Sequence, residues 1–195
     1  MRKITILIFA LFVLSCPRLS AQVKLGAKDG YLFSSASGDI DIRHYDGYTV
    51  GLTGCIPVGS SSNIIGEVLY SKRGYKMDNS VVVDGEWKDL KVAFSYIDIP
   101  VMFEYKVFPF ASIVGGGYWG IQAGRSLYYS GEKQSDTMMG KKQLFDFGLL
   151  TGVRLHYMDL FLEAQYQHGF TAPYKEIGVF KPRSFCVNLG YMFSL

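Results

Sequence analysis

The chain has 195 residues, a hydrophobic fraction of 49%, an aromatic fraction of 15% and a formal net charge of +3 at pH 7. This length suits one domain, and the small charge is spread along the chain without the Lys/Arg cluster that a nucleic-acid groove needs. The 22 Gly, 14 Tyr and 14 Phe residues favour β structure with tight turns.

The N-terminus predicts an exported protein. Two basic residues precede an apolar stretch, residues 4–14, which is too short to span a bilayer and is followed by the small residue Ala21. We therefore expect a cleavable signal peptide over residues 1–21 and a mature domain over residues 22–195. The alternative, a lipid anchor on Cys16, fits the flanking residues poorly.

Period-2 alternation of apolar and polar residues recurs along the mature chain, and no helical stripe interrupts it. The pattern predicts about eight strands, at residues 23–33, 47–56, 63–75, 91–106, 109–124, 144–157, 160–169 and 184–195.

The connections between these strands alternate in length. Four are long and polar, at residues 34–46, 76–90, 125–142 and 170–183, and the others are short enough for hairpin turns, such as Met158-Asp159. This alternation is typical of an outer-membrane barrel with short periplasmic turns and long extracellular loops.

The two faces of the predicted strands differ in chemistry. In the last strand Phe185, Val187 and Leu189 share one face, while Cys186 and Asn188 share the other. The exposed face of a water-soluble barrel should carry many charges, but the polar face here is mainly Gly, Thr, Gln and Asn. We therefore expect an all-β, eight-stranded antiparallel transmembrane up-and-down β-barrel, with its apolar face in lipid and its polar face in the lumen.

Aromatic residues near the strand ends are expected to form girdles at the two membrane interfaces. The candidates are Tyr31, Tyr48, Tyr70 and Phe145 at one rim, and Tyr105, Tyr157, Tyr191 and Phe193 at the other.

Charged residues within the strands are predicted to point into this lumen. A two-residue turn at Met158-Asp159 places Arg154 directly opposite Glu163. Ions in so narrow a space must be paired, so we expect a plugged lumen whose ion pairs fix the register of the barrel strands. A proton or ion path through the same residues is the less favoured alternative. The inward acids are Glu67, Asp98, Glu104, Asp146 and Glu163, and the inward bases are Lys24, Lys28, Arg73 and Arg154.

Three smaller expectations follow from the same pattern. Cys55 and Cys186 should lie at opposite ends of the barrel, too far apart for a disulfide. Asp29 shares the apolar parity of the first strand, which suggests a bulge near Gly26 or Gly30. The fifth strand is apolar on both parities, so its inward face is not assigned.

Four stretches, "YIDIPVMFEY", "EVLYSKRGY", "FDFGLLTGVRLHY" and "NLGYMF", together resemble the PorT-like family of outer-membrane β-barrel proteins, and the resemblance covers residues 23–195. It implies an integral barrel in the outer membrane of a Gram-negative bacterium, inserted by the barrel-assembly machinery. A link to protein secretion is a possibility that the family's name carries. The terminal Ser-Leu departs from the aromatic last residue usual in such barrels.

The remaining features favour a structural or interaction role. His44 and His168 lie toward the outer rim, but no nucleophile, base and orienting group match in spacing, so we expect no enzyme, no metal and no cofactor. An outer-membrane lipid-modifying enzyme and a secreted lipocalin-like barrel with an apolar ligand are the alternatives. We expect a monomer whose partners are outer-membrane lipid and an unidentified surface or periplasmic protein. Aromatic residues in the long loops could bind that protein or anchor at the membrane: Trp87, Tyr128, Tyr129 and Tyr174.

Overall fold

The computed structural model describes residues 23–37, 44–83, 86–129, 132–134, 144–171 and 181–194. The predicted signal peptide lies outside these residues. Within them, no helix is long and apolar enough to cross a membrane.

The described residues form nine strands. They are β1 (Lys24–Ser37), β2 (Tyr45–Pro57), β3 (Ser62–Val83), β4 (Glu86–Phe108), β5 (Ala111–Tyr129), β6 (Glu132–Gln134), β7 (Phe145–Tyr157), β8 (Leu160–Gly169) and β9 (Lys181–Ser194).

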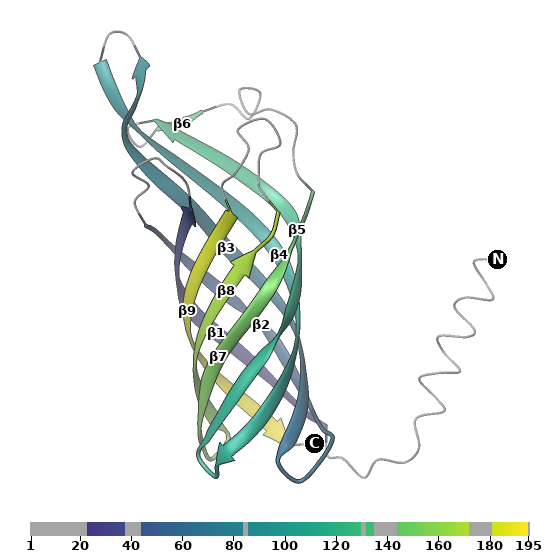
Figure 1. Cartoon of the computed structure of the whole chain (residues 1–195). Helices are drawn as coiled ribbons and strands as arrows, with labels where there is room; N and C mark the ends of the chain where they lie inside the picture. The colour runs from purple at the N-terminus through teal and green to yellow at the C-terminus, as the bar shows by residue number, and fades with distance from the viewer. Residues whose placement is uncertain are drawn as a thin grey trace, which may run out of the picture.

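Eight of these strands close into a barrel. The sheet order is β4-β3-β2-β1-β9-β8-β7-β5-β6, and an additional β4–β5 pairing joins the two sides of the sheet. The first and last strands, β1 and β9, pair antiparallel, and β6 pairs with β5 at three positions. The predicted eight-stranded antiparallel barrel is therefore confirmed, and its strands run steeply tilted around a common axis (Figure 1).

The two ends of the barrel differ. At one end, here called the turn end, the strands are joined across residues 58–61, 109–110 and 158–159, and β9 finishes there beside the start of β1. The opposite end, here called the loop end, carries the long connections. Met158 has a φ of 55°, the left-handed conformation that two-residue hairpin turns require.

The predicted long loop at residues 76–90 was wrong. These residues extend β3 and β4 to Val83 and Glu86, with one register shift between Met77 and Val81. The ribbon they form rises beyond the rest of the barrel at the loop end (Figure 1). Their polar composition resembles that of a loop, but two antiparallel strands that pair with each other need no apolar face to satisfy their backbone groups.

The side chains divide between wall and lumen as predicted. On β8, Leu162 is 46% exposed, and on β9 Leu189 is 52% exposed, whereas Arg154 and Glu163 are 2% and 0% exposed. β7 alternates exposed and buried residues along most of its length. A water-soluble protein with this many large apolar side chains on its surface would aggregate, so the outer wall suits lipid.

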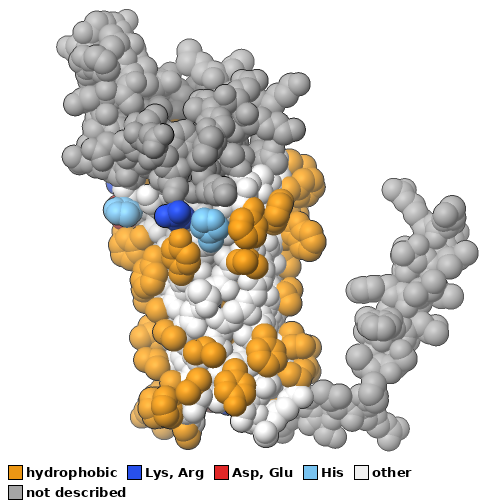
Figure 2. Space-filling view, viewed as in Figure 1, with side chains coloured by type: hydrophobic (Ala, Val, Ile, Leu, Met, Phe, Trp, Pro, Cys, Tyr) orange, Lys and Arg blue, Asp and Glu red, His pale blue; other side chains and the backbone are white. Residues whose placement is uncertain are grey.

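The aromatic girdles are also present. All eight predicted girdle residues are exposed on the outer wall. In the space-filling view, apolar side chains gather in a band toward each end of the described barrel (Figure 2). Pairs such as Tyr31 with Phe33 and Tyr191 with Phe193, both with ring centroids 4.8 Å apart, contribute to these bands.

The first strand carries no bulge in the described residues. β1 pairs with both neighbours without a register shift, and Asp29 lies on the exposed face between Val50 and Leu189. The expectation of a bulge near Gly26 or Gly30 was therefore wrong. Gly26 and Gly30 stay in the regular ladder, and the polar carboxylate is tolerated on the wall.

The structure assigns the inward face of β5. Ser112, Val114, Tyr118 and Gln122 are buried, while Trp119 on the other parity is 67% exposed. Apolar content alone could not separate the two faces, because the lumen also holds a small apolar cluster. Val114 and Tyr118 belong to that cluster.

The two mature cysteines are far apart in the barrel. Both are buried and unpaired. Cys55 lies opposite Lys24 and Cys186 opposite Leu32, and these positions on β1 are separated by roughly 26 Å at 3.3 Å per residue.

We accordingly predict that oxidation of the folded mature protein leaves Cys55 and Cys186 as free thiols, because their separation exceeds the reach of a disulfide. The measurement is the mass of the protein after oxidant treatment, unfolding and maleimide labelling. Two labels per chain are expected, and a chain that takes up no label would contradict the strand register.

Candidate functional site

The buried charges of the lumen are built around the β7–β8 hairpin. Arg154 pairs with Glu163 in the ladder, as the two-residue turn predicted. The Nε of Arg154 donates to Oε2 of Glu163 at 2.8 Å, and Nη2 donates to the same oxygen at 2.5 Å. The guanidinium also lies over the ring of Phe161, with Cζ 4.3 Å from the ring centroid.

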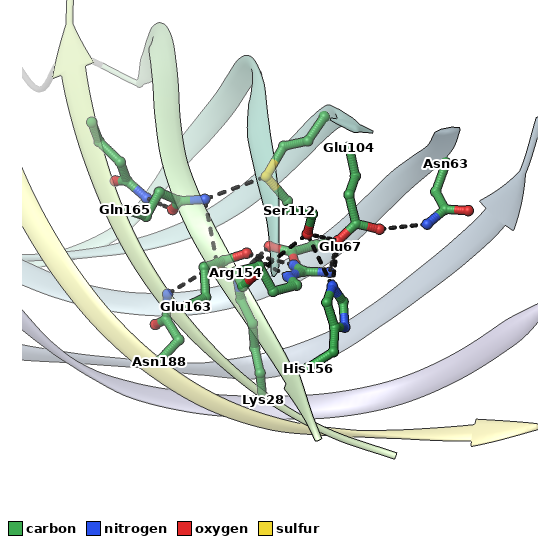
Figure 3. Close-up of polar contacts among 12 residues, drawn as sticks. Lys28, Asn63, Glu67, Glu104, Ser112, Arg154, His156, Glu163, Gln165 and Asn188 are labelled. Carbon is green, nitrogen blue, oxygen red and sulfur yellow. Dashed lines mark hydrogen bonds and ion pairs between the residues drawn. The ribbon is translucent and has the colours of Figure 1, made fainter. Parts of the chain in front are cut away.

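Two further residues extend this pair across the lumen. The ammonium of Lys28 on β1 lies 2.9 Å from Oε1 of Glu163 and 2.7 Å from Oε2 of Glu67 on β3. Glu67 also lies 3.5 Å from Nη2 of Arg154. These four side chains come from β1, β3, β7 and β8 and are almost fully buried, so they connect opposite sides of the barrel (Figure 3).

Glu104 on β4 occupies the part of the network nearest the turn end. Its carboxylate accepts hydrogen bonds from Nδ2 of Asn63 at 2.5 Å and Oγ of Ser112 at 2.7 Å, and its Oε1 lies 3.0 Å from Nε2 of His156. Nη1 of Arg154 is 4.0 Å away. We call Lys28, Glu67, Glu104, Arg154 and Glu163 the lower cluster.

Sequence reasoning missed Asn63, Ser112 and His156. Asn63 and His156 have the inward parity of their strands, and that parity was the available signal for them. Ser112 lies on β5, whose inward face the sequence does not assign. Parity alone did not single out Asn63 and His156, because neither carries a permanent charge that requires an ionic partner. The three side chains supply most of the hydrogen bonds that keep Glu104 satisfied in a buried position.

The contact among Ser112, His156 and Glu104 brings together the residue types of a hydrolase triad. In a catalytic relay, the hydroxyl and the carboxylate bond to different nitrogens of the imidazole. Here Oγ of Ser112, at 2.9 Å, and Oε1 of Glu104, at 3.0 Å, both face Nε2 of His156. The hydroxyl also donates directly to the carboxylate, so the arrangement satisfies a buried acid and differs from the geometry of a catalytic relay.

Amides continue the network from Glu163 toward the loop end. Asn188 donates to Glu163 at 3.2 Å, and Gln165 lies 3.5 Å from the same carboxylate. Gln167 in turn donates to Gln165 at 2.9 Å. Nε2 of Gln165 also lies 3.3 Å from Sδ of Met102, so these polar side chains are held between apolar ones.

A second group of charges lies farther toward the loop end. Arg73 on β3 forms an ion pair with Asp98 on β4, and its Nη1 lies 3.6 Å from Oδ2 of Asp146 on β7. Tyr118 donates to Asp146 at 3.2 Å. The guanidinium lies over the ring of Tyr96, 4.4 Å from its centroid. We call Arg73, Asp98 and Asp146 the upper cluster.

Each cluster holds one more acid than base. The lower cluster has three carboxylates for two bases, and the upper cluster has two carboxylates for one base. Because unpaired buried charge is costly, each of these acids lies within 4.0 Å of a base.

The structure therefore brings eight of the nine predicted inward charges into two clusters: Arg154, Glu163, Glu104, Glu67 and Lys28 in the lower one, and Arg73, Asp98 and Asp146 in the upper one. Lys24 has the inward parity but lines a hollow of about 380 Å³ at the turn end, which also reaches Arg154 and His156.

The predicted loop aromatics are placed differently. Trp87 belongs to β4, and Tyr128 and Tyr129 belong to β5, so these three are strand residues and not loop residues. The ring centroid of Tyr128 is 5.9 Å from Nζ of Lys91. Tyr174 lies outside the described residues. The error has the same cause as the predicted loop at 76–90, since polar strands that extend beyond a membrane lack an apolar alternation.

Among the residues that the structure describes, no three His, Cys, Asp or Glu side chains are grouped so as to hold a metal ion.

Comparison with known proteins agrees with this geometry. Residues 17–173 match a family model described as outer membrane protein beta-barrel domain. A comparison with curated protein sequences gives no match.

Two solved structures illustrate the shared architecture. Ail, the attachment invasion locus protein of Yersinia pestis, is similar with a TM-score of 0.54 and 16% identity, over 88% of this chain and 99% of that chain. Neisserial surface protein A is similar with a TM-score of 0.51 and 15% identity, over 89% of this chain and 97% of that chain. Identities this low show the fold alone. The family match covers most of the sequence, so this chain belongs to the outer membrane protein beta-barrel domain family and is a transmembrane protein of the Gram-negative outer membrane.

Proposed function

We propose that this protein is a monomeric, non-conducting outer-membrane barrel with a structural or interaction role, whose lumen is plugged by the lower and upper clusters. The observation that carries the proposal is the link made by Lys28, Glu67, Arg154 and Glu163, which joins four strands across the lumen through ion pairs. An eight-stranded barrel is just wide enough for side chains to fill its interior.

The same residues argue against the two alternatives of other classes. A lipocalin-like barrel places apolar side chains in its lumen to hold an apolar ligand, whereas Arg154 and Glu163 occupy that position here. A lipid-modifying enzyme needs an activated nucleophile near the outer rim. The contact of Ser112 with His156 lies toward the turn end and lacks relay geometry, so it supports a non-catalytic protein.

The interaction role is supported by the extension of β3 and β4. In outer-membrane barrels, short turns face the periplasm and long connections face the exterior, which puts the loop end outside the cell. The pairing of β2 with β3 stops at Lys72, and the backbone of Gly74 is hydrogen-bonded to the hydroxyl of Ser34. In the described residues, the same edge of β3 from Tyr75 to Val83 has no strand partner. An unpaired edge can accept a strand from another protein.

The remaining partners are proposals of the same kind. We propose that the barrel contacts outer-membrane lipid through its wall, meets the barrel-assembly machinery during insertion and binds an unidentified surface or periplasmic protein. A link to secretion rests on the PorT-like resemblance. It predicts that a deletion strain exports less protein, and normal export from such a strain would remove it.

The plugged lumen is tested by ion conductance. We expect purified protein in a planar bilayer to give no current above the bilayer background, because buried ion pairs cross the lumen between four of its strands. The variant carrying both Arg154→Ser and Glu163→Ser replaces the two side chains of one ion pair by shorter neutral ones, so neither partner is left as an unpaired charge. We expect this variant to conduct ions. Steady current through the unmodified protein, at the level of a known open porin, would contradict the proposal.

A further inference from the structure

The outer wall of the barrel contains a hollow that is separate from the lumen. A space of about 840 Å³ lies across β4, β5, β7, β8 and β9, and one of about 460 Å³ adjoins it toward the loop end. The two spaces share Thr151 and Tyr166, so we treat them as one feature, the lateral groove. Its lining is mostly apolar and includes Phe103, Tyr105, Thr151, Ala164, Tyr166 and Phe185.

The floor of the lateral groove is made of small residues between aromatic walls. Gly115 lies between Phe103 and Thr151 in the ladder, and Thr151 lies beside Tyr166. In the space-filling view, the middle of the described wall is pale, as expected where side chains are small, between the two apolar bands (Figure 2). The depression is therefore bounded by large rings and floored by backbone.

Backbone crowding does not require glycine in this floor. A Cβ at Gly115 would meet nothing nearer than 3.9 Å. Gly117 lies beside the groove, opposite the lining residue Leu149 in the ladder, and a Cβ there would meet nothing nearer than 3.5 Å, so both are ordinary contacts. By contrast, a Cβ at the inward-facing Gly116 would lie 2.1 Å from the carbonyl oxygen of Val101. A larger residue at 115 or 117 could fill the wall without strain, so the hollow is not a by-product of strand packing.

The upper end of the lateral groove is basic. The groove reaches His168, and His168 pairs in the ladder with Arg183, which is exposed on the same outer face. In the described part of the chain, no carboxylate forms an ion pair with Arg183. Basic and His side chains line the upper margin of the described surface (Figure 2), which is the loop end and the level of the lipid headgroups.

We propose that the lateral groove is a binding site for one phosphorylated glycolipid of the outer leaflet, of the lipid A type. One acyl chain lies against Gly115 and Thr151, and a phosphate group contacts Arg183 and His168. The apolar groove matches the chain, and the basic end matches the anionic headgroup at the leaflet it faces.

A second copy of this chain fits the same surface less well. Two copies related by a two-fold axis would present the same patch to each other. That arrangement would bring the two copies of Arg183 close together, and this juxtaposition of like charges costs free energy. The charge pattern therefore favours an anionic lipid as the occupant.

The experiment measures lipid retention by native mass spectrometry of the detergent-solubilised protein, with hexa-acylated lipid A or phosphatidylglycerol added. We expect one lipid A per chain and weaker retention of phosphatidylglycerol. Gly115→Leu with Gly117→Leu should weaken lipid A binding about ten-fold by filling the groove. Arg183→Gln should weaken it about five-fold by removing a basic contact at the membrane surface.

Matched controls separate these effects from general damage. Gly66→Leu adds the same side chain to another part of the outer wall, where a Cβ has no atom within 4 Å, and Lys72→Gln removes a base from β3. Both should bind lipid A as the unmodified protein does. Heat-dependent electrophoretic migration reports whether each variant is folded, and Thr151→Leu replaces the double glycine variant if that variant does not fold.

Three results would overturn the proposal. The first is equal retention of lipid A by the groove-filled variant and by Gly66→Leu. The second is equal retention of phosphatidylglycerol and lipid A by the unmodified protein. The third is a dimer of the unmodified protein that becomes monomeric in the groove-filled variant while lipid binding stays the same. Conductance does not enter this test, so its outcome is independent of whether the lumen is plugged.

Discussion

Arg154→Ala is expected to lower the free energy of unfolding by about 3–5 kcal/mol, which is the effect of removing one partner from a buried ion pair. The guanidinium contacts Glu163 directly and lies within 4.0 Å of Glu104 and 3.5 Å of Glu67. Without it, Lys28 is the one base left for three carboxylates. The measurement is urea unfolding of the refolded protein in lipid vesicles, followed by tryptophan fluorescence.

Lys106→Ala is the matched control for this experiment. Lys106 is a base on β4 near the same end of the barrel, but its side chain is exposed. Its removal should change the free energy of unfolding by less than about 1 kcal/mol. Adding Glu163→Gln to Arg154→Ala should recover part of the loss, because one stranded charge is removed. Equal stability of Arg154→Ala and Lys106→Ala would contradict the pairing.

Gly116→Ala is expected to destabilise the barrel by about 3 kcal/mol or to prevent its folding, since an inserted methyl in a tight space forces the backbone to move. Its Cβ would lie 2.1 Å from the carbonyl oxygen of Val101 and 2.8 Å from Cα of Met102 on the paired strand. The measurement is again urea unfolding in vesicles, preceded by the fraction folded after refolding.

The neighbouring Gly115→Ala provides an internal comparison. The two glycines are adjacent on β5 but face opposite sides, and a Cβ at Gly115 meets nothing nearer than 3.9 Å. This variant should fold with stability within about 0.5 kcal/mol of the unmodified protein. If Gly115→Ala is as damaging as Gly116→Ala, the assignment of wall and lumen faces on β5 is wrong.

The β7–β8 hairpin shows what local pattern can predict. Its turn has two residues, so the ladder is fixed within one position, and alternation then names the face of each side chain. Predicting a cross-strand pair from sequence needs a short turn and two opposite charges at equal distances from that turn, and Arg154 and Glu163 meet both conditions. The structure places them directly opposite each other.

The contacts between side chains on opposite sides of the lumen could not be predicted from the sequence. Lys28 meets Glu163 although 135 positions separate them, and that distance depends on barrel closure, strand tilt and side-chain length together. The neutral residues around Glu104 were missed for a related reason. A Ser or Asn of inward parity has no obligatory ionic partner, so sequence alone does not single out Ser112 or Asn63.

The strand extension at the loop end shows the opposite failure. Alternation of apolar and polar residues identifies strands where one face of the sheet meets lipid. It does not identify strands where both faces of a ribbon meet water. Residues 76–90 were therefore read as a loop, although β3 and β4 pair there to Val83 and Glu86. The identity of the inward face of β5 was similarly hidden, because Val114 and Tyr118 place apolar atoms in the lumen.

The central claim is that the apolar wall faces lipid while the charges face the lumen, and Trp119 tests it most directly. The chain has two Trp residues, so Trp87→Phe leaves Trp119 as the single indole. Trp119 is 67% exposed on the outer face of β5. In vesicles, we expect brominated acyl chains to quench its fluorescence and aqueous iodide to leave it unchanged. Quenching by iodide without quenching by brominated lipid would contradict the account.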